Sequence, residues 1–131
     1  MLIDLKPAIT QALRNNSALV LLLGDKKVWP QVAPTEFINS KGIKVPVTTP
    51  YVTFSEITNF DNRYASNTAF SSEIHFQIDI WTQSDTGPSA IEVNRTMEEL
   101  GFTRSGSTDL FETETKTYHK VLRYKTIKYG S

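Results

Sequence analysis

The residues whose types best suit acid–base or metal chemistry are two histidines and one aspartate. His75 and Asp79 lie in the stretch Ser72 to Gln83, whose apolar and polar residues alternate strictly, a pattern typical of a β-strand. Residues four apart on a strand are separated by about 13 Å, so His75 and Asp79 cannot form a catalytic pair with each other. His119 can reach Asp79 or His75 only if the last strand pairs beside this one. A working site would still need a third ligand or a nucleophile, and the sequence offers no candidate.

The rest of the sequence carries no recognised catalytic pattern. The adjacent carboxylates Glu98 and Glu99 point about 100° apart on a helix, which indicates a solvated surface. There is no glycine-rich phosphate loop, nucleophile elbow or HExxH motif. The absence of cysteine excludes disulfides and thiolate metal sites. The sequence therefore predicts no enzyme activity, no cofactor and no metal; a small enzyme or ligand-binding domain that uses His75, Asp79 and His119 is the alternative.

Charge and hydropathy narrow the remaining classes of function. Fourteen basic residues balance fourteen acidic ones, which argues against nucleic-acid binding as the main role. In the last strand Arg123 and Lys125 are predicted on one face, and Lys120 lies on the other. The longest apolar run, residues 18–23, is too short to span a membrane, and the N-terminus lacks a signal-peptide pattern. We expect a soluble protein that is not secreted and binds no membrane.

Three helices are expected. The first begins near Asp4 and carries Pro7 in its first turn, where a missing N–H costs little. Ser17 is predicted to cap a second, short helix from Ala18 to Leu23, which is apolar nearly all round and should be buried. The third runs from Pro88 to Leu100 with an apolar stripe along one side.

Strands fill most of the remaining chain. They are predicted at Lys27–Val32, Tyr51–Ile57, Ser72–Gln83, Asp109–Glu112 and Thr117–Lys128, with a further short strand near Phe102. Consecutive strands without helical connections favour antiparallel pairing. The pattern predicts a single domain over residues 1–131 with an α+β fold, in which helices pack on one face of a small, mostly antiparallel sheet.

Two segments are predicted as loops. Residues 33–50 contain several prolines and no sustained period, which indicates a long irregular loop. Residues 59–71 are rich in Asn, Asp and Ser, as loops are, yet they also hold Phe60, Tyr64 and Phe70. Aromatic residues on a loop either fold back on the core or meet a partner, so protein–protein contact is the function that this architecture favours.

Three stretches together resemble a known family. They read DLKPAITQALRNNSALVLLLG, ITNFDNRYASNTAFSSEIHFQIDIW and ELGFTRSGSTDLFETETKTYHKVLRYKT. In this combination and order they resemble the tail-completion proteins of long-tailed, non-contractile bacteriophages, especially those of Gram-positive hosts, also described as tail-terminator or head–tail joining proteins. The chain departs from the family mainly at Glu36 to Thr49, which is longer than expected.

The resemblance implies a structural, non-catalytic protein of the virion. Such proteins are made in the host cytoplasm and assemble as a ring, typically a hexamer, on the head-proximal end of the tail tube. The ring stops tail polymerisation and offers the surface that docks on the head. The implied partners are the tail tube protein, the head–tail connector or neck proteins and further copies of the chain. A neck or head-completion protein on the portal side is the alternative within the same virion.

The residues expected to make these contacts lie in the two predicted loops. They are Lys41 and Lys44 in the first, and Asn59, Phe60, Arg63, Tyr64 and Phe70 in the second. DNA passing through the ring is a further contact for the basic residues of the last strand, although their division between two faces weakens that assignment.

Overall fold

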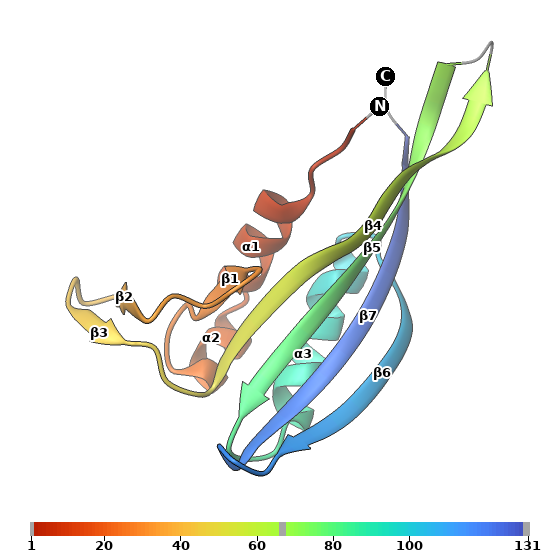
Figure 1. The fold of residues 1–131 in the computed structure, drawn as a ribbon. Helices are drawn as coiled ribbons and strands as arrows, with labels where there is room; N and C mark the ends of the chain where they lie inside the picture. The colour runs from red at the N-terminus through yellow and green to blue at the C-terminus, as the bar shows by residue number, and fades with distance from the viewer. Residues whose placement is uncertain (1, 66–67, 130–131) are drawn as a thin grey trace.

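The fold consists of one layer of helices against one face of a twisted sheet (Figure 1). The structure, a computed structural model, describes residues 2–65 and 68–129. Over these residues the main sheet has the strand order β1-β4-β5-β7-β6, and a separate pair, β2 and β3, lies beside β1. The expected α+β fold is confirmed.

Five strands form the main sheet, and all neighbours pair antiparallel except β1 and β4, which run parallel. Their bounds are β1 Val28–Pro30, β4 Tyr51–Ala65, β5 Thr68–Thr82, β6 Thr103–Glu112 and β7 Thr117–Tyr129. The two short strands predicted between Phe102 and Glu112 are in fact one strand, β6. It forms one edge of the sheet, and all ten of its residues are exposed.

The core lies between the sheet and the helices. Alternate residues of β5 point into it, and Ile74, Phe76, Ile78 and Ile80 are completely buried, as the period of two predicts. The helices supply the facing side chains from Ile9 and Leu13 of α1 (Lys6–Arg14), Leu19 and Leu23 of α2 (Ser17–Leu23), and Val93 and Met97 of α3 (Gly87–Glu99). None of the helices in the described part of the chain is long and apolar enough to cross a membrane.

Tyr124 of β7 carries a polar group into this core. The ring is completely buried and its hydroxyl donates to Asn94 Oδ1 of α3 at 2.8 Å. Burial raises the pKa of the Tyr124 hydroxyl, so the group stays protonated and remains a donor. The bond fixes α3 on the sheet.

The short helix α2 differs from its prediction in two ways. Its cap is Asn16, whose Oδ1 accepts from the Leu19 N–H at 3.0 Å, and not Ser17. It is also not buried all round, because Leu21 is 83% exposed and Leu22 is 42% exposed. α2 packs on α1 and α3 with one side only, so its other side meets solvent.

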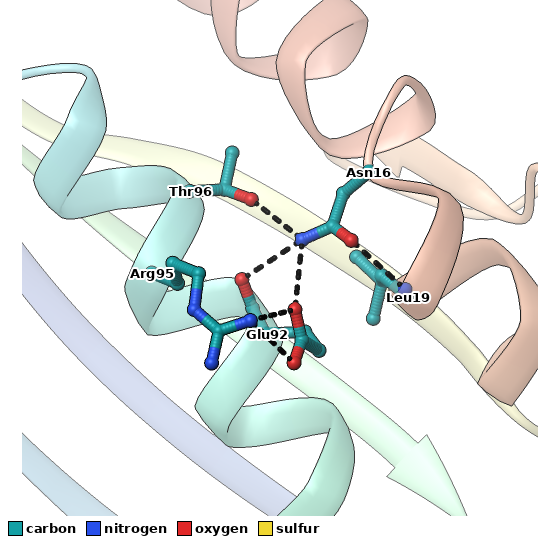
Figure 2. A network of polar contacts seen from close by, with 5 residues as sticks. All are labelled: Asn16, Leu19, Glu92, Arg95 and Thr96. Atoms are coloured by element: carbon teal, nitrogen blue, oxygen red, sulfur yellow. Dashed lines mark hydrogen bonds and ion pairs between the residues drawn. The ribbon is translucent and has the colours of Figure 1, made fainter.

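Asn16 also joins the α1–α2 junction to α3 (Figure 2). Its Nδ2 donates to Thr96 Oγ1 at 2.9 Å, to the Glu92 carbonyl at 3.2 Å and to Glu92 Oε1 at 3.4 Å. Arg95 holds the same Glu92 carboxylate at 2.9 Å. One amide side chain therefore caps α2 and anchors it on α3.

The aromatic loop predicted at residues 59–71 is wrong for residues 59–65 and 68–71, while residues 66–67 lie outside the described part of the chain. β4 extends to Ala65 and β5 begins at Thr68, and the two strands pair antiparallel here, with Asn59 opposite Ile74 and Arg63 opposite Ser71. The register shifts near Ile57 and between Asp61 and Arg63. Such bulges interrupt the period of two, so this length of strand does not show the alternation that identifies the rest.

The irregular loop predicted at residues 33–50 is also only partly correct. Glu36–Ile38 (β2) and Lys44–Pro46 (β3) pair antiparallel around a turn at Gly42, whose φ is +78°. We call residues 36–46 the small hairpin. Strands of three residues are too short to show a period, which is why the sequence pattern missed them.

Candidate functional site

The sheet face opposite the helices holds the histidines and aspartate singled out in the sequence. β7 pairs beside β5, and this places His119 Nε2 2.7 Å from Asp79 Oδ1. Gln77 Nε2 donates to the same Asp79 oxygen at 3.0 Å. His75 is elsewhere on this face, where its ring bonds Glu73 at 2.9 Å. The structure thus joins His119 to Asp79 and leaves His75 out.

An aromatic row surrounds the His119–Asp79 pair. Trp81 stacks on the His119 ring with centroids 3.7 Å apart, and Tyr51 stacks on Trp81 at 6.1 Å. The row continues through Trp29 to Phe37 of the small hairpin, in edge contacts at 6.5 and 5.4 Å. It therefore crosses β7, β5, β4 and β1 and ties the small hairpin to the main sheet.

The geometry of this pair favours a structural role. His119 and Asp79 side chains are each only 12% exposed, and Trp81 covers the imidazole ring. The second ring nitrogen of His119 lies 3.8 Å from Glu112, so carboxylates stand near both nitrogens. No group of three or more metal-ligating side chains occurs within residues 2–65 and 68–129.

A hollow in the surface lies elsewhere, along α1. It is about 810 Å³, and its lining includes Lys6, Gln11 and Arg14. Arg14 donates to the Val28 carbonyl at 2.9 Å, and burial lowers the pKa of its guanidinium. Arg14 therefore fastens α1 to β1. Asp4 and Lys6, which also line the hollow, form an ion pair at 3.1 Å.

The far end of the β4–β5 hairpin is the first of three exposed surfaces. We call residues 59–65 and 68–71 the hairpin arm, which extends beyond the helical layer (Figure 1). Phe60 is 47% exposed and stacks on His75 at 6.4 Å, while Tyr64 is 60% exposed. Arg63 is exposed as well. All five contact residues predicted in this segment lie on the arm, since Asn59 and Phe70 belong to it as well.

Asn59 and Phe70 are the other two predicted contact residues on the hairpin arm. Asn59 is half-buried, and its Nδ2 donates to the Ile3 carbonyl at 2.7 Å and to Glu56 Oε1 at 3.0 Å. It therefore ties the N-terminal segment to β4. Phe70 lies in β5, but the placement of its side chain is outside what the structure describes.

The tip of the small hairpin is the second exposed surface. It presents Lys41 and Lys44, the two other predicted contact residues, and also Ile38 and Ile43, which are 70% and 56% exposed. Asn39 Oδ1 accepts from the N–H groups of Lys41 and Ile43 at 3.0 Å and so fixes the turn.

Polar contacts fasten the small hairpin, at Ser40, and the segment that follows it, at Thr48, to the body of the protein. Asp25 accepts from the Ser40 N–H at 3.0 Å, from its hydroxyl at 3.1 Å and from the Lys26 N–H at 2.7 Å. The bonds from Ser40 and Lys26 lower the pKa of the Asp25 carboxyl. Lys27 Nζ donates to the Thr48 carbonyl at 2.9 Å. The tip is therefore presented in a defined position.

The third exposed surface was not found from the sequence. Leu110 and Phe111 on β6 are 48% and 49% exposed, and Phe111 contacts the Tyr118 ring of β7 at 4.9 Å. In the sequence these residues look like ordinary strand core. The open edge that exposes them depends on β6 being last in the sheet, which only the pairing shows.

The described residues form a helix-backed sheet with two hairpins that present exposed side chains. Residues 7–129 match the family described as tail completion protein gp17, and the chain belongs to that family of structural phage tail proteins. No curated protein matches the chain. A chain in a solved structure described as the virion of a native gene transfer agent particle has a TM-score of 0.68. It is 15% identical, and the match covers 96% of this chain and 95% of that one, which shows a shared fold.

Proposed function

We propose that the protein caps the head-proximal end of the tail tube as a ring and provides the surface for joining the tail to the head. The family match over residues 7–129 is the observation that carries this proposal. The similarity in fold to a chain of a virion particle supports a place in a virion. The neck is the place that we propose, after synthesis in the host cytoplasm.

The shape of the sheet supports ring formation. A ring needs a head-to-tail interface in which two different patches of the subunit meet. The sheet ends in β1 and the small hairpin on one side and in the exposed strand β6 on the other. Each copy therefore has two unlike edges, as a closed ring of identical subunits requires; a hexamer is the expected size.

The hairpin arm is the proposed contact with the tail tube or the connector. It extends past the helices and carries Phe60, Arg63 and Tyr64 at its surface. Exposed aromatic and arginine side chains are enriched in interfaces. A hairpin that is already hydrogen-bonded loses little conformational entropy on binding, which favours affinity.

The test is to mix the purified protein with tail tubes and examine the tube ends by electron microscopy. The proposal predicts a ring of density at one end of the tubes. If the protein leaves tube ends bare and instead binds purified portal-bearing heads, the portal-side alternative replaces it. If it binds neither, the proposed function is refuted.

A further inference from the structure

The half of β6 nearest the β6–β7 turn is an open strand edge. Among the described residues β6 pairs only with β7, and a register shift near Gly106 interrupts the pairing in its first half. From Ser107 to Glu112 the register is continuous. We call residues 107–112 the β6 edge. It contains no proline, lysine or bulge, three of the devices that protect a strand edge from pairing with another chain, and its charged residues are Asp109 and Glu112.

This edge combines apolar contact area with negative charge. Leu110 and Phe111 are both about half exposed, and they lie on opposite faces of the strand. Asp109 is 72% exposed and Glu112 is 48% exposed. Glu114 follows in the exposed turn. Lys120 engages Asp109 at 3.0 Å, but no basic residue occurs in the sequence from 107 to 115.

The tip of the small hairpin has the complementary composition. It carries two exposed isoleucines, Ile38 and Ile43, and two exposed lysines, Lys41 and Lys44. There is no acidic residue from 37 to 47. Opposite charges around an apolar centre give an interface its orientation as well as part of its affinity.

The two surfaces lie on opposite sides of the sheet. The small hairpin is beside β1, and β6 is the far edge strand (Figure 1). Because one copy holds one surface of each kind, a contact between them repeats from copy to copy and generates a closed ring or an open filament.

From this complementarity we propose that the tip of the small hairpin of one copy binds the β6 edge of the next copy. Ile38 and Ile43 then cover Leu110 and Phe111, and the lysines face the carboxylates. This inference rests on the ring of the proposed function, but it is independent of what the ring binds. The partner is a second copy of this chain.

Cysteine cross-linking gives a direct test, because the chain contains no cysteine. We expect Ile43→Cys and Leu110→Cys proteins, mixed and oxidised at high protein concentration with and without tail tubes, to give a mixed dimer. One chain carrying both changes should give a ladder of oligomers. The control pairs Ile43→Cys with Leu21→Cys, since Leu21 is 83% exposed on α2, which packs on α1 and α3. Equal cross-linking of the test and control pairs would overturn the proposal.

Charge reversal gives a second test that does not depend on oxidation. We expect Lys41→Glu with Lys44→Glu to reduce ring formation at least tenfold, and Asp109→Lys with Glu114→Lys to do the same. All four changes together should restore it. These side chains are exposed, and circular dichroism checks that each variant is folded. No effect in either pair of changes, or no rescue in the combined variant, would overturn the inference.

The two proposals can fail separately. If wild-type rings cap tubes while the cross-links and charge reversals have no specific effect, the proposed contact is wrong and the proposed function stands. If the specific cross-linked ladder forms but no tube end is ever capped, the contact stands and the proposed function is wrong.

Discussion

Replacing Asn16 by alanine should destabilise the protein more than any other change of a half-exposed polar residue in the helical layer. The change removes the cap of α2, which is worth about 1 kcal/mol. It also removes an amide that donates to Thr96 and Glu92 of α3, at about 1 kcal/mol for each effective bond. We therefore expect the free energy of unfolding to fall by about 2–3 kcal/mol.

The measurement is urea unfolding followed by the fluorescence of the two tryptophans, Trp29 and Trp81. A loss of this size should lower the melting temperature by roughly 8–12 °C in a protein of this length. Asn16→Ser separates the two roles of the side chain, because serine keeps a capping oxygen but has no amide to reach α3. Its loss should be about half that of the alanine variant.

Asn15→Ala is the matched control. Asn15 is the exposed neighbour at the end of α1, and its bonds to Gln11 and Leu13 are made by the backbone. Its replacement should change the free energy of unfolding by less than about 0.5 kcal/mol. If Asn16→Ala is as mild as Asn15→Ala, the network in Figure 2 does not hold α2 on α3, and the reasoning fails.

Three further results are expected. Replacing His75 and His119 by alanine together should lower the free energy of unfolding by about 1–3 kcal/mol, because Asp79 loses its bond to His119 and keeps only that from Gln77. The double variant should still cap tail tubes, and a folded variant unable to cap them would favour the alternative that the histidines do chemistry. The bonds from Ser40 and Lys26 lower the pKa of Asp25, so the stability that Asp25 gives to the attachment of the small hairpin should be complete above about pH 5 and lost as the pH falls below about 4. Protonation of Asp25 should release the small hairpin, and amide exchange at Ser40 measures that release. The Asp25→Asn variant should show fast exchange at Ser40 at every pH. Tyr64→Ala should weaken binding to tail tubes at least tenfold, whereas Ile91→Ala, which changes an equally exposed residue on α3, should not. If both variants weaken binding equally, the hairpin arm is not the contact with the tail tube.

The strongest local patterns were correctly predicted from the sequence. The alternation in Ser72–Gln83 placed Ile74, Phe76, Ile78 and Ile80 on the buried face, and the stripe of α3 was correct as well. These elements depend on side-chain periodicity, which is a property of neighbouring residues. The class α+β followed from their order.

The distant pairings were decided by the tertiary structure. His119 contacts Asp79 because β7 pairs beside β5. The sequence pattern shows that this pairing would bring the two residues together, but it does not show which strands pair. The cap of α2 is Asn16 and not Ser17 because the helix already begins at Ser17, and the amide of Asn16 also finds acceptors on α3. A serine side chain has an oxygen that can cap a helix but no amide to donate to α3.

What the sequence by itself determined is which faces of its regular elements are apolar, together with a combination of stretches that resembles the tail-completion family. What the tertiary structure decided is where the polar segments belong. Residues 59–65 and 68–71 look like a loop because bulges break their alternation, yet these residues pair with one another and with the rest of the hairpin. In the same way, Leu110 and Phe111 look like core until the strand order places β6 at the edge. Exposure is set by neighbours distant in the chain, and local periodicity does not contain that information.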